Sequence, residues 1–116
     1  MAELIYHICR KVEWLKAKKI GVYTGSADDK RDGFIHFSTA NQVLGSAEKH
    51  WANVEGLVLL SVDPVVLGEK IKWEPSRDNE MFPHLYGELD IKAVSDAFDL
   101  IIGYNGKHEF PDHLLI

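Results

Sequence analysis

Residues 34–62 read FIHFSTANQVLGSAEKHWANVEGLVLLSV, and this stretch decides the fold class. Its first part, 34–38, favours a strand that runs directly into a helix, because Thr39 and Gln42 have the spacing of a capping box. Apolar residues then recur on one helical face, at Ala40, Val43, Leu44, Ala47 and Trp51. Residues 57–62 are a continuous apolar run of strand length, typical of a central strand buried on both faces. The stretch predicts an amphipathic helix packed on a sheet.

The flanking sequence adds further strands and two polar segments. We expect strands at 4–9, 22–25, 70–74, 82–87 and 93–102 from their apolar, aromatic and β-branched residues. The stretches 26–33 and 76–81 are rich in charge and turn formers, which predicts exposed loops.

Two helical segments complete the pattern. One covers residues 10–19 and ends at Gly21. The other is a single turn that starts at Asp63 and Pro64 and ends at Gly68. Many strands and few helices in mixed order predict one α+β domain over residues 1–116, with a split, mostly antiparallel sheet.

Composition excludes several classes of protein. The chain has a formal net charge of −5, which argues against a nucleic-acid partner. We interpret its basic run, Arg10, Lys11, Lys16, Lys18 and Lys19, as the solvated face of the first helix. No apolar stretch reaches the ~20 residues of a membrane span, and the N-terminus lacks the pattern of a signal peptide. We therefore expect a cytoplasmic protein without a membrane partner, and the pattern leaves the oligomeric state undefined.

Cys9 is the sole cysteine and ends an apolar run, which predicts a small buried hydrophobe.

Three histidines lie in the middle of apolar or aromatic strands: His7, His36 and His84. A buried imidazole needs partners for two nitrogens, so three such residues in one small domain indicate a shared site. The two-residue period of a strand places Ser38 on the face of His36, and Tyr86 on the face of His84. We expect these side chains to line one cleft.

Glu74 ends the strand 70–74, in which Ile71 and Trp73 alternate with polar residues. It is either a solvent-exposed carboxylate or the acidic member of the cleft. A three-histidine zinc site and a nucleophilic Ser38 are weaker hypotheses, because neither HxH, HExxH nor G-x-S-x-G spacing is present. The expected catalytic residues are His7, His36, His84 and Glu74, and the expected ligand-binding residues are Ser38, Tyr86, Phe82 and Tyr6. No metal ligand is assigned.

Four motifs carry a resemblance to a known family. IYHI (5–8), DGFIHFST (32–39), a strand that ends in WE (73–74) and FPHLYG (82–87) resemble the domain of unknown function 952 over about residues 4–98. The fold of that family is similar to the ADP-ribosyltransferase fold, a split sheet around an NAD-binding cleft.

The resemblance implies roles for individual residues. It gives His7 the task of holding the ligand ribose, and it places His36 and Ser38 beside the nicotinamide ribose. His84 and Tyr86 lie in the region where the superfamily often has a catalytic glutamate, and Glu74 and Glu88 are the nearby acids. None maps cleanly onto that glutamate.

Two hypotheses follow from these observations. The first is a protein that binds NAD, ADP-ribose or another nucleotide as a small-molecule ligand and carries out ADP-ribosyl transfer or related NAD chemistry, with NAD as substrate rather than a resident cofactor. The alternative is a non-catalytic binding or interaction domain whose histidines order the core.

Overall fold

Short helices separate most of the strands along the chain. The structure is a computed structural model that describes residues 3–114. The strands are β1 (Ile5–Arg10), β2 (Val22–Tyr23), β3 (Ile35–His36), β4 (Leu57–Val62), β5 (Ile71–Pro75), β6 (Met81–Leu85), β7 (Leu89–Asp90), β8 (Val94–Ile102) and β9 (His108–Glu109). The helices are α1 (Lys11–Ile20), α2 (Ala27–Asp32) and α3 (Ala40–His50), with 3₁₀ segments η1 (Pro64–Lys70), η2 (Arg77–Asn79), η3 (Ile91–Ala93) and η4 (Asp112–Leu114).

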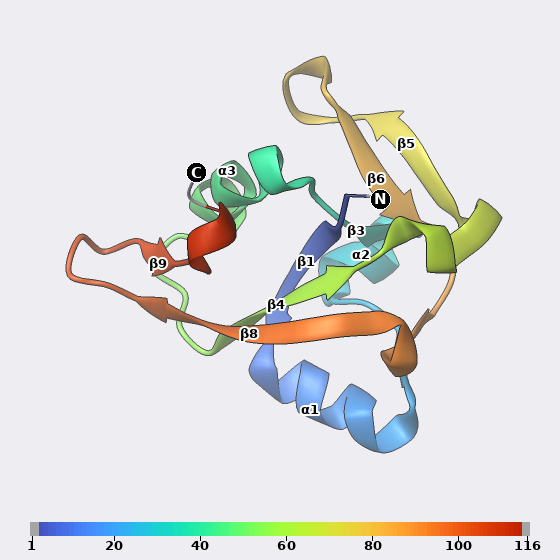
Figure 1. Cartoon of the computed structure of the whole chain (residues 1–116), viewed down its shortest axis with the longest axis horizontal. Coiled ribbons are helices and arrows are strands. Elements are labelled where there is room, and N and C mark those ends of the chain that lie inside the picture. Colours follow the sequence, from blue (N-terminus) through green and yellow to red (C-terminus); the bar gives the residue numbers. More distant parts are fainter. Residues whose placement is uncertain (1–2, 115–116) are drawn as a thin grey trace.

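Strand β4 is a central strand of the main sheet, as its apolar run predicts. It pairs antiparallel with β1 on one side and with β8 on the other, giving the order β1-β4-β8-β9. Every residue of β4 is buried, so both faces of the sheet need a cover. Figure 1 shows α1 and α3 on opposite sides of these strands. The expected α+β class with antiparallel pairing is confirmed.

Alternate residues of β4 enter two separate cores. Val58, Leu60 and Val62 pack with Trp14 and Ala17 of α1 in the first core, which also contains the fully buried Cys9. Burial raises the pKa of the Cys9 thiol to about 12, which keeps it protonated and in its expected role as a small hydrophobe.

The second core lies on the other face of the sheet. Leu57 and Leu59 pack there with Val43 and Ala47 of α3. Helix α3 begins at Thr39 with the predicted capping box to Gln42, and α1 ends at the predicted Gly21 in the left-handed conformation.

A second sheet, in the order β3-β6-β5, meets the main sheet at β1. The junction is a single antiparallel bridge, in which the N–H of Tyr6 donates to the carbonyl of Ser38 at 2.8 Å and the N–H of Ser38 donates back at 2.7 Å. Strands β2 and β7 form a separate two-stranded antiparallel sheet. The sheet is therefore split at β1, where Tyr6, next to His7, meets Ser38, two residues after His36.

One expectation from the sequence is wrong: the segment 26–33 contains helix α2 and buries Asp29, so it is not an exposed loop. The segment 76–81 is exposed as expected, apart from the partly buried Arg77, and it contains the 3₁₀ turn η2, which leads into β6 at Met81. Trp73 of the edge strand β5 is 45% exposed.

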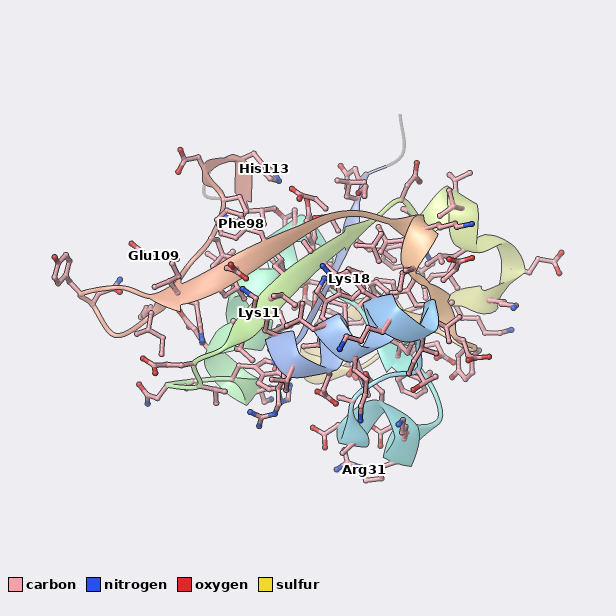
Figure 2. All side chains as sticks on the ribbon, turned by 90° about the horizontal axis from the view of Figure 1, so that it is seen from below. Lys11, Lys18, Arg31, Phe98, Glu109 and His113 are labelled. Atoms are coloured by element: carbon pink, nitrogen blue, oxygen red, sulfur yellow. The ribbon has the colours of Figure 1, made fainter. Side chains whose placement is uncertain are left out.

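The five basic residues from Arg10 to Lys19 are exposed. Figure 2 shows Lys11 and Lys18 on the outer surface of α1, in agreement with the solvated-face interpretation. Among the helices of residues 3–114, none has the length and apolar character that crossing a membrane requires.

Candidate functional site

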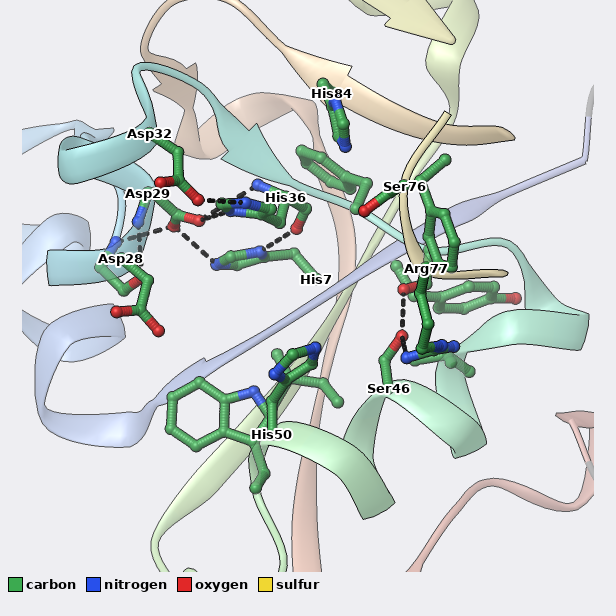
Figure 3. Close-up of a pocket in the computed structure, with 18 of the residues that line it drawn as sticks. His7, Asp28, Asp29, Asp32, His36, Ser46, His50, Ser76, Arg77 and His84 are labelled. Atoms are coloured by element: carbon green, nitrogen blue, oxygen red, sulfur yellow. Dashed lines mark hydrogen bonds and ion pairs between the residues drawn. The ribbon is translucent and has the colours of Figure 1, made fainter. Parts of the chain in front are cut away.

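A cavity of about 300 Å³ opens where the two sheets separate, between α2, α3, β6 and the turn 76–80 (Figure 3). Six of the eight residues expected to form a site line it: Tyr6, His7, His36, Ser38, Phe82 and His84. Glu74 and Tyr86 are not among the lining residues; Glu74 bonds to His84, and Tyr86 bonds to Glu74. The convergence of the three histidine strands is thus observed.

Strand register brings two of the histidines together. His36 and His84 are direct partners in the β3–β6 ladder, so their rings project to the same face and lie 5.7 Å apart, centroid to centroid. Phe34 stacks on His84 at 4.0 Å and contacts His36 at 4.6 Å. The aromatic packing fixes both imidazoles at one end of the cavity.

Asp29, which the sequence interpretation missed, is the polar centre of the site. It is 3% exposed and stands at the third position of α2, in a capping box with Ser26: its Oδ2 accepts the Ser26 N–H at 2.8 Å. Gly25 leaves room for it, because a Cβ at Gly25 would lie 2.8 Å from the Asp29 Cβ. The backbone of α2 therefore positions a buried carboxylate beside His36.

His36 is held between two carboxylates. Its Nδ1 lies 2.6 Å from Asp29 Oδ1, and its Nε2 lies 3.0 Å from Asp32 Oδ2. Both ring nitrogens face acceptors, which requires the doubly protonated imidazolium. The hydrogen bond to Asp29 raises the pKa of His36 above 6.5, against the opposing effect of partial burial. Burial alone would raise the pKa of Asp29, but the hydrogen bonds from His36 and the backbone bring it down to about 2.

His7 is neutral and fully occupied within the chain. Its Nδ1 donates to the His36 carbonyl at 2.5 Å, and its Nε2 accepts from the Tyr23 hydroxyl at 2.8 Å. Burial lowers the pKa of His7 and raises that of Tyr23, which agrees with this tautomer. Nδ1 of His7 thus ties β1 to β3, and Nε2 ties β1 to β2, so a ligand would have to displace Tyr23 to reach Nε2.

His84 differs from the other two because one of its nitrogens has no partner in residues 3–114. Nδ1 donates to Glu74 Oε1 at 2.8 Å, and the Tyr86 hydroxyl donates to the same oxygen at 2.6 Å. No fully buried side-chain nitrogen or oxygen in this part of the chain lacks a partner, so the unbonded Nε2 must be accessible. Figure 3 shows His84 pointing into the cavity from β6.

The opposite side of the cavity carries residues that no motif indicated. Arg77 donates to Ser46 Oγ at 3.4 Å, and Ser46 Oγ lies 2.9 Å from Ser38 Oγ. Ser46 is on α3 and Arg77 is on η2, so only the tertiary fold brings them to the predicted Ser38.

Within residues 3–114, no group of three or more His, Cys, Asp or Glu side chains has an arrangement that could hold a metal ion. The cavity is lined by histidines, carboxylates, serine hydroxyls and the guanidinium groups of Arg31 and Arg77.

The opposite pKa shifts of His7 and His36 predict that the free energy of unfolding is greatest near pH 6.5. His36 binds its proton more tightly in the folded chain, so its contribution is complete below 6.5 and is lost as pH rises through its raised pKa. His7 stays neutral in the folded chain, so stability falls when pH drops below 6.5 and the unfolded chain takes up a proton. His50, whose pKa burial also lowers, acts in the same direction as His7.

Urea unfolding at several pH values measures this dependence. His36→Gln should remove the decline on the alkaline side and keep the decline on the acidic side. A wild-type stability that continues to rise between about pH 6.5 and pH 8 would contradict the charge assignment of His36.

Comparisons with known proteins agree with the fold. A family model described as "Protein of unknown function (DUF952)" matches residues 8–97, close to the expected range. The crystal structure of protein CC0527 from Caulobacter crescentus is 42% identical, with a TM-score of 0.91 over 97% of this chain and 99% of that chain. The crystal structure of a double mutant of CC0527 gives the same values.

The solution NMR structure of CC0527 is 43% identical, with a TM-score of 0.85 over 95% of each chain. A search of curated proteins found no match. None of these relatives is described as an ADP-ribosyltransferase or as a nucleotide-binding protein.

Proposed function

Because the chain belongs to the DUF952 family, whose description names no activity, we propose a function from the geometry of the cavity. The cavity binds a small nucleotide-type ligand, with NAD or ADP-ribose as the class that the family resemblance implies. His84 then acts on the bound ligand as a general base, which makes the chain a transferase or hydrolase of ribosyl or phosphoryl groups.

One observation carries this proposal: the His84 ring donates through Nδ1 to Glu74 and leaves Nε2 open to the cavity. A carboxylate on one nitrogen fixes the tautomer in which the other nitrogen is the proton acceptor. Nε2 can therefore take a proton from a water molecule or from an acceptor hydroxyl in the cavity. Glu74 is a positioning residue in this proposal.

The walls of the cavity favour a ligand with both flat and polar parts. Tyr6, Phe37, Trp51 and Phe82 supply aromatic surface, and Ser38 and Ser46 supply hydroxyls. The volume lies at the lower end of the range of roughly 300–1,000 Å³ for small-molecule sites. This size suits a mononucleotide, so a dinucleotide such as NAD would extend out of the opening.

A second candidate is a non-catalytic binding domain with a structural histidine cluster. It is favoured by the bonding of His7 and His36, whose four ring nitrogens all have partners within the chain. In both candidates these two histidines organise β3 and α2, which changes their expected catalytic roles to structural ones.

Thermal denaturation with NAD, ADP-ribose and AMP tests the proposal, followed by chromatography of the incubated ligands. A ligand at ten times its Kd stabilises the folded chain by about 1.4 kcal/mol, which raises Tm by roughly 5 °C. A Tm increase together with new products, such as free nicotinamide, supports the enzyme. A Tm increase with unchanged ligand supports the binding domain, and no increase at millimolar ligand contradicts the proposed nucleotide site.

A further inference from the structure

We infer that Arg77, together with Ser46 and Ser38, forms a binding site for the phosphoryl group of the ligand. This inference rests on the proposed function only in taking the same cavity as the ligand site. The phosphoryl group is the part of the ligand that is recognised, and the side of the cavity with Arg77 recognises it.

The guanidinium of Arg77 has unused hydrogen-bonding capacity. Within residues 3–114 it forms no ion pair, and its one hydrogen bond is the 3.4 Å contact with Ser46 Oγ. An arginine side chain carries five N–H donors in a planar fork that matches phosphate oxygens. A partly buried, positively charged group with free donors in a cavity is suited to an anion.

The guanidinium is also held in place, which an ordinary surface arginine is not. It lies over the Phe82 ring at 5.1 Å and against α3 at Gly45. A Cβ at Gly45 would lie 3.3 Å from Nη2, so the glycine leaves the space that the guanidinium occupies. The next two residues, Asp78 and Asn79, have positive φ values of 56° and 61°, a conformation uncommon outside glycine. The turn thus aims Arg77 at the cavity at some cost in backbone energy.

Two hydroxyls extend the same surface. Ser46 Oγ and Ser38 Oγ are 2.9 Å apart, and either can donate a hydrogen bond to an oxygen placed between them and the guanidinium. Ser38 is buried and its backbone is fixed by the bridge to Tyr6. A charged fork beside two hydroxyls is a common arrangement for phosphoryl recognition.

The charges of the other side of the cavity set the orientation of the ligand. Figure 3 shows Arg77 and Ser46 on one side, and Asp28, Asp29 and Asp32 on the other. The carboxylates on the acidic side are already paired with basic side chains. Arg31 pairs with Asp28 and Asp32. His36 pairs with Asp29. A phosphoryl group is therefore attracted to the Arg77 side, and hydroxyl donors of a sugar are directed toward the carboxylates.

Titration of the whole chain by NMR or by thermal denaturation tests the site, with inorganic phosphate, AMP, adenosine and acetate as probes. We expect binding of phosphate and AMP, and much weaker binding of adenosine and acetate. Arg77→Gln should weaken phosphate and AMP by about 10- to 100-fold, the range typical for loss of a charge-assisted contact. Ser46→Ala should weaken them several-fold.

Lys18→Gln is the matched control, because Lys18 also lies over an aromatic ring, that of Trp14, and neither residue lines the cavity. Gly45→Ala is a second probe: the folded chain should have an unchanged or higher Tm, since alanine favours a helix, and a weaker affinity for phosphate, since the Cβ displaces the guanidinium.

Equal affinities of the wild type and Arg77→Gln would overturn the inference, as would equal binding of acetate and phosphate. If AMP binding depends on Arg77 but no nucleotide is turned over, the result supports the phosphoryl site and contradicts the general-base role of His84. If a nucleotide is turned over and Arg77→Gln has no effect, the result contradicts the phosphoryl site and leaves the general-base role of His84 in place.

Discussion

Asp29→Ala should lower the free energy of unfolding by about 3–5 kcal/mol, the range for breaking a buried charged pair. The substitution removes the acceptor of the Ser26 N–H, the His36 N–H and the His36 ring. Each buried donor left without a partner costs about 1–3 kcal/mol. It also leaves the protonated His36 with only the exposed carboxylate of Asp32.

Urea unfolding of Asp29→Ala and Asp32→Ala compares how much a buried and an exposed carboxylate partner of His36 contribute to the free energy of unfolding. Asp32→Ala should cost much less than Asp29→Ala, because exposed ion pairs contribute little. Asp29→Asn should fall between the two, since it keeps the shape and one acceptor, and the pKa of His36 should return toward 6.5 in an NMR titration. A loss below about 1 kcal/mol for Asp29→Ala would mean that this carboxylate does not organise the site.

His84→Gln should lower kcat by about 10²- to 10⁴-fold, the usual contribution of a general base. The substrate for this measurement is the nucleotide for which chromatography of the incubated ligands detects products. KM should change little, because the guanidinium and hydroxyls that bind the ligand remain.

Glu74→Gln distinguishes the contribution of Glu74, which positions the imidazole, from that of His84, which accepts the proton. It should reduce kcat by a smaller factor than His84→Gln and leave KM little changed, because an amide cannot hold the imidazolium as a carboxylate does. Tyr86→Phe is the control, since it removes a donor to Glu74 and leaves the His84 contact in place. If His84→Gln retains more than about a tenth of wild-type kcat, another group is the base.

The elements that bury apolar surface could be predicted from the sequence, because their pattern repeats over many residues. The stripe of α3 and the continuous run of β4 are examples, and both lie within a residue of their expected bounds. The two-residue period of a strand predicted that Ser38 shares a face with His36, and both residues line the cavity. The contact of Tyr86 and His84 with a common oxygen of Glu74 agrees with their predicted shared face.

The polar part of the site was harder to predict, because one or two residues decide it. Asp29 was hidden in a segment rich in charge; the available signal was the capping-box spacing of Ser26 and Asp29 between two glycines. Arg77 gave no signal at all, since its partners Ser46 and Phe82 come from other elements. Tyr23 was placed in a strand, but its bond to His7 depends on how β2 lies against β1.

The bridge between Tyr6 and Ser38 makes the cavity depend on the docking of the two sheets. Its two hydrogen bonds join segments that are 32 positions apart, and the neighbouring bond from His7 to the His36 carbonyl spans a similar interval. Either sheet formed alone would have half of the cavity wall and no enclosed volume. A ligand would therefore bind only to molecules in which the two sheets are docked, and it would stabilise that state. The fraction of docked molecules would then rise with the concentration of the ligand.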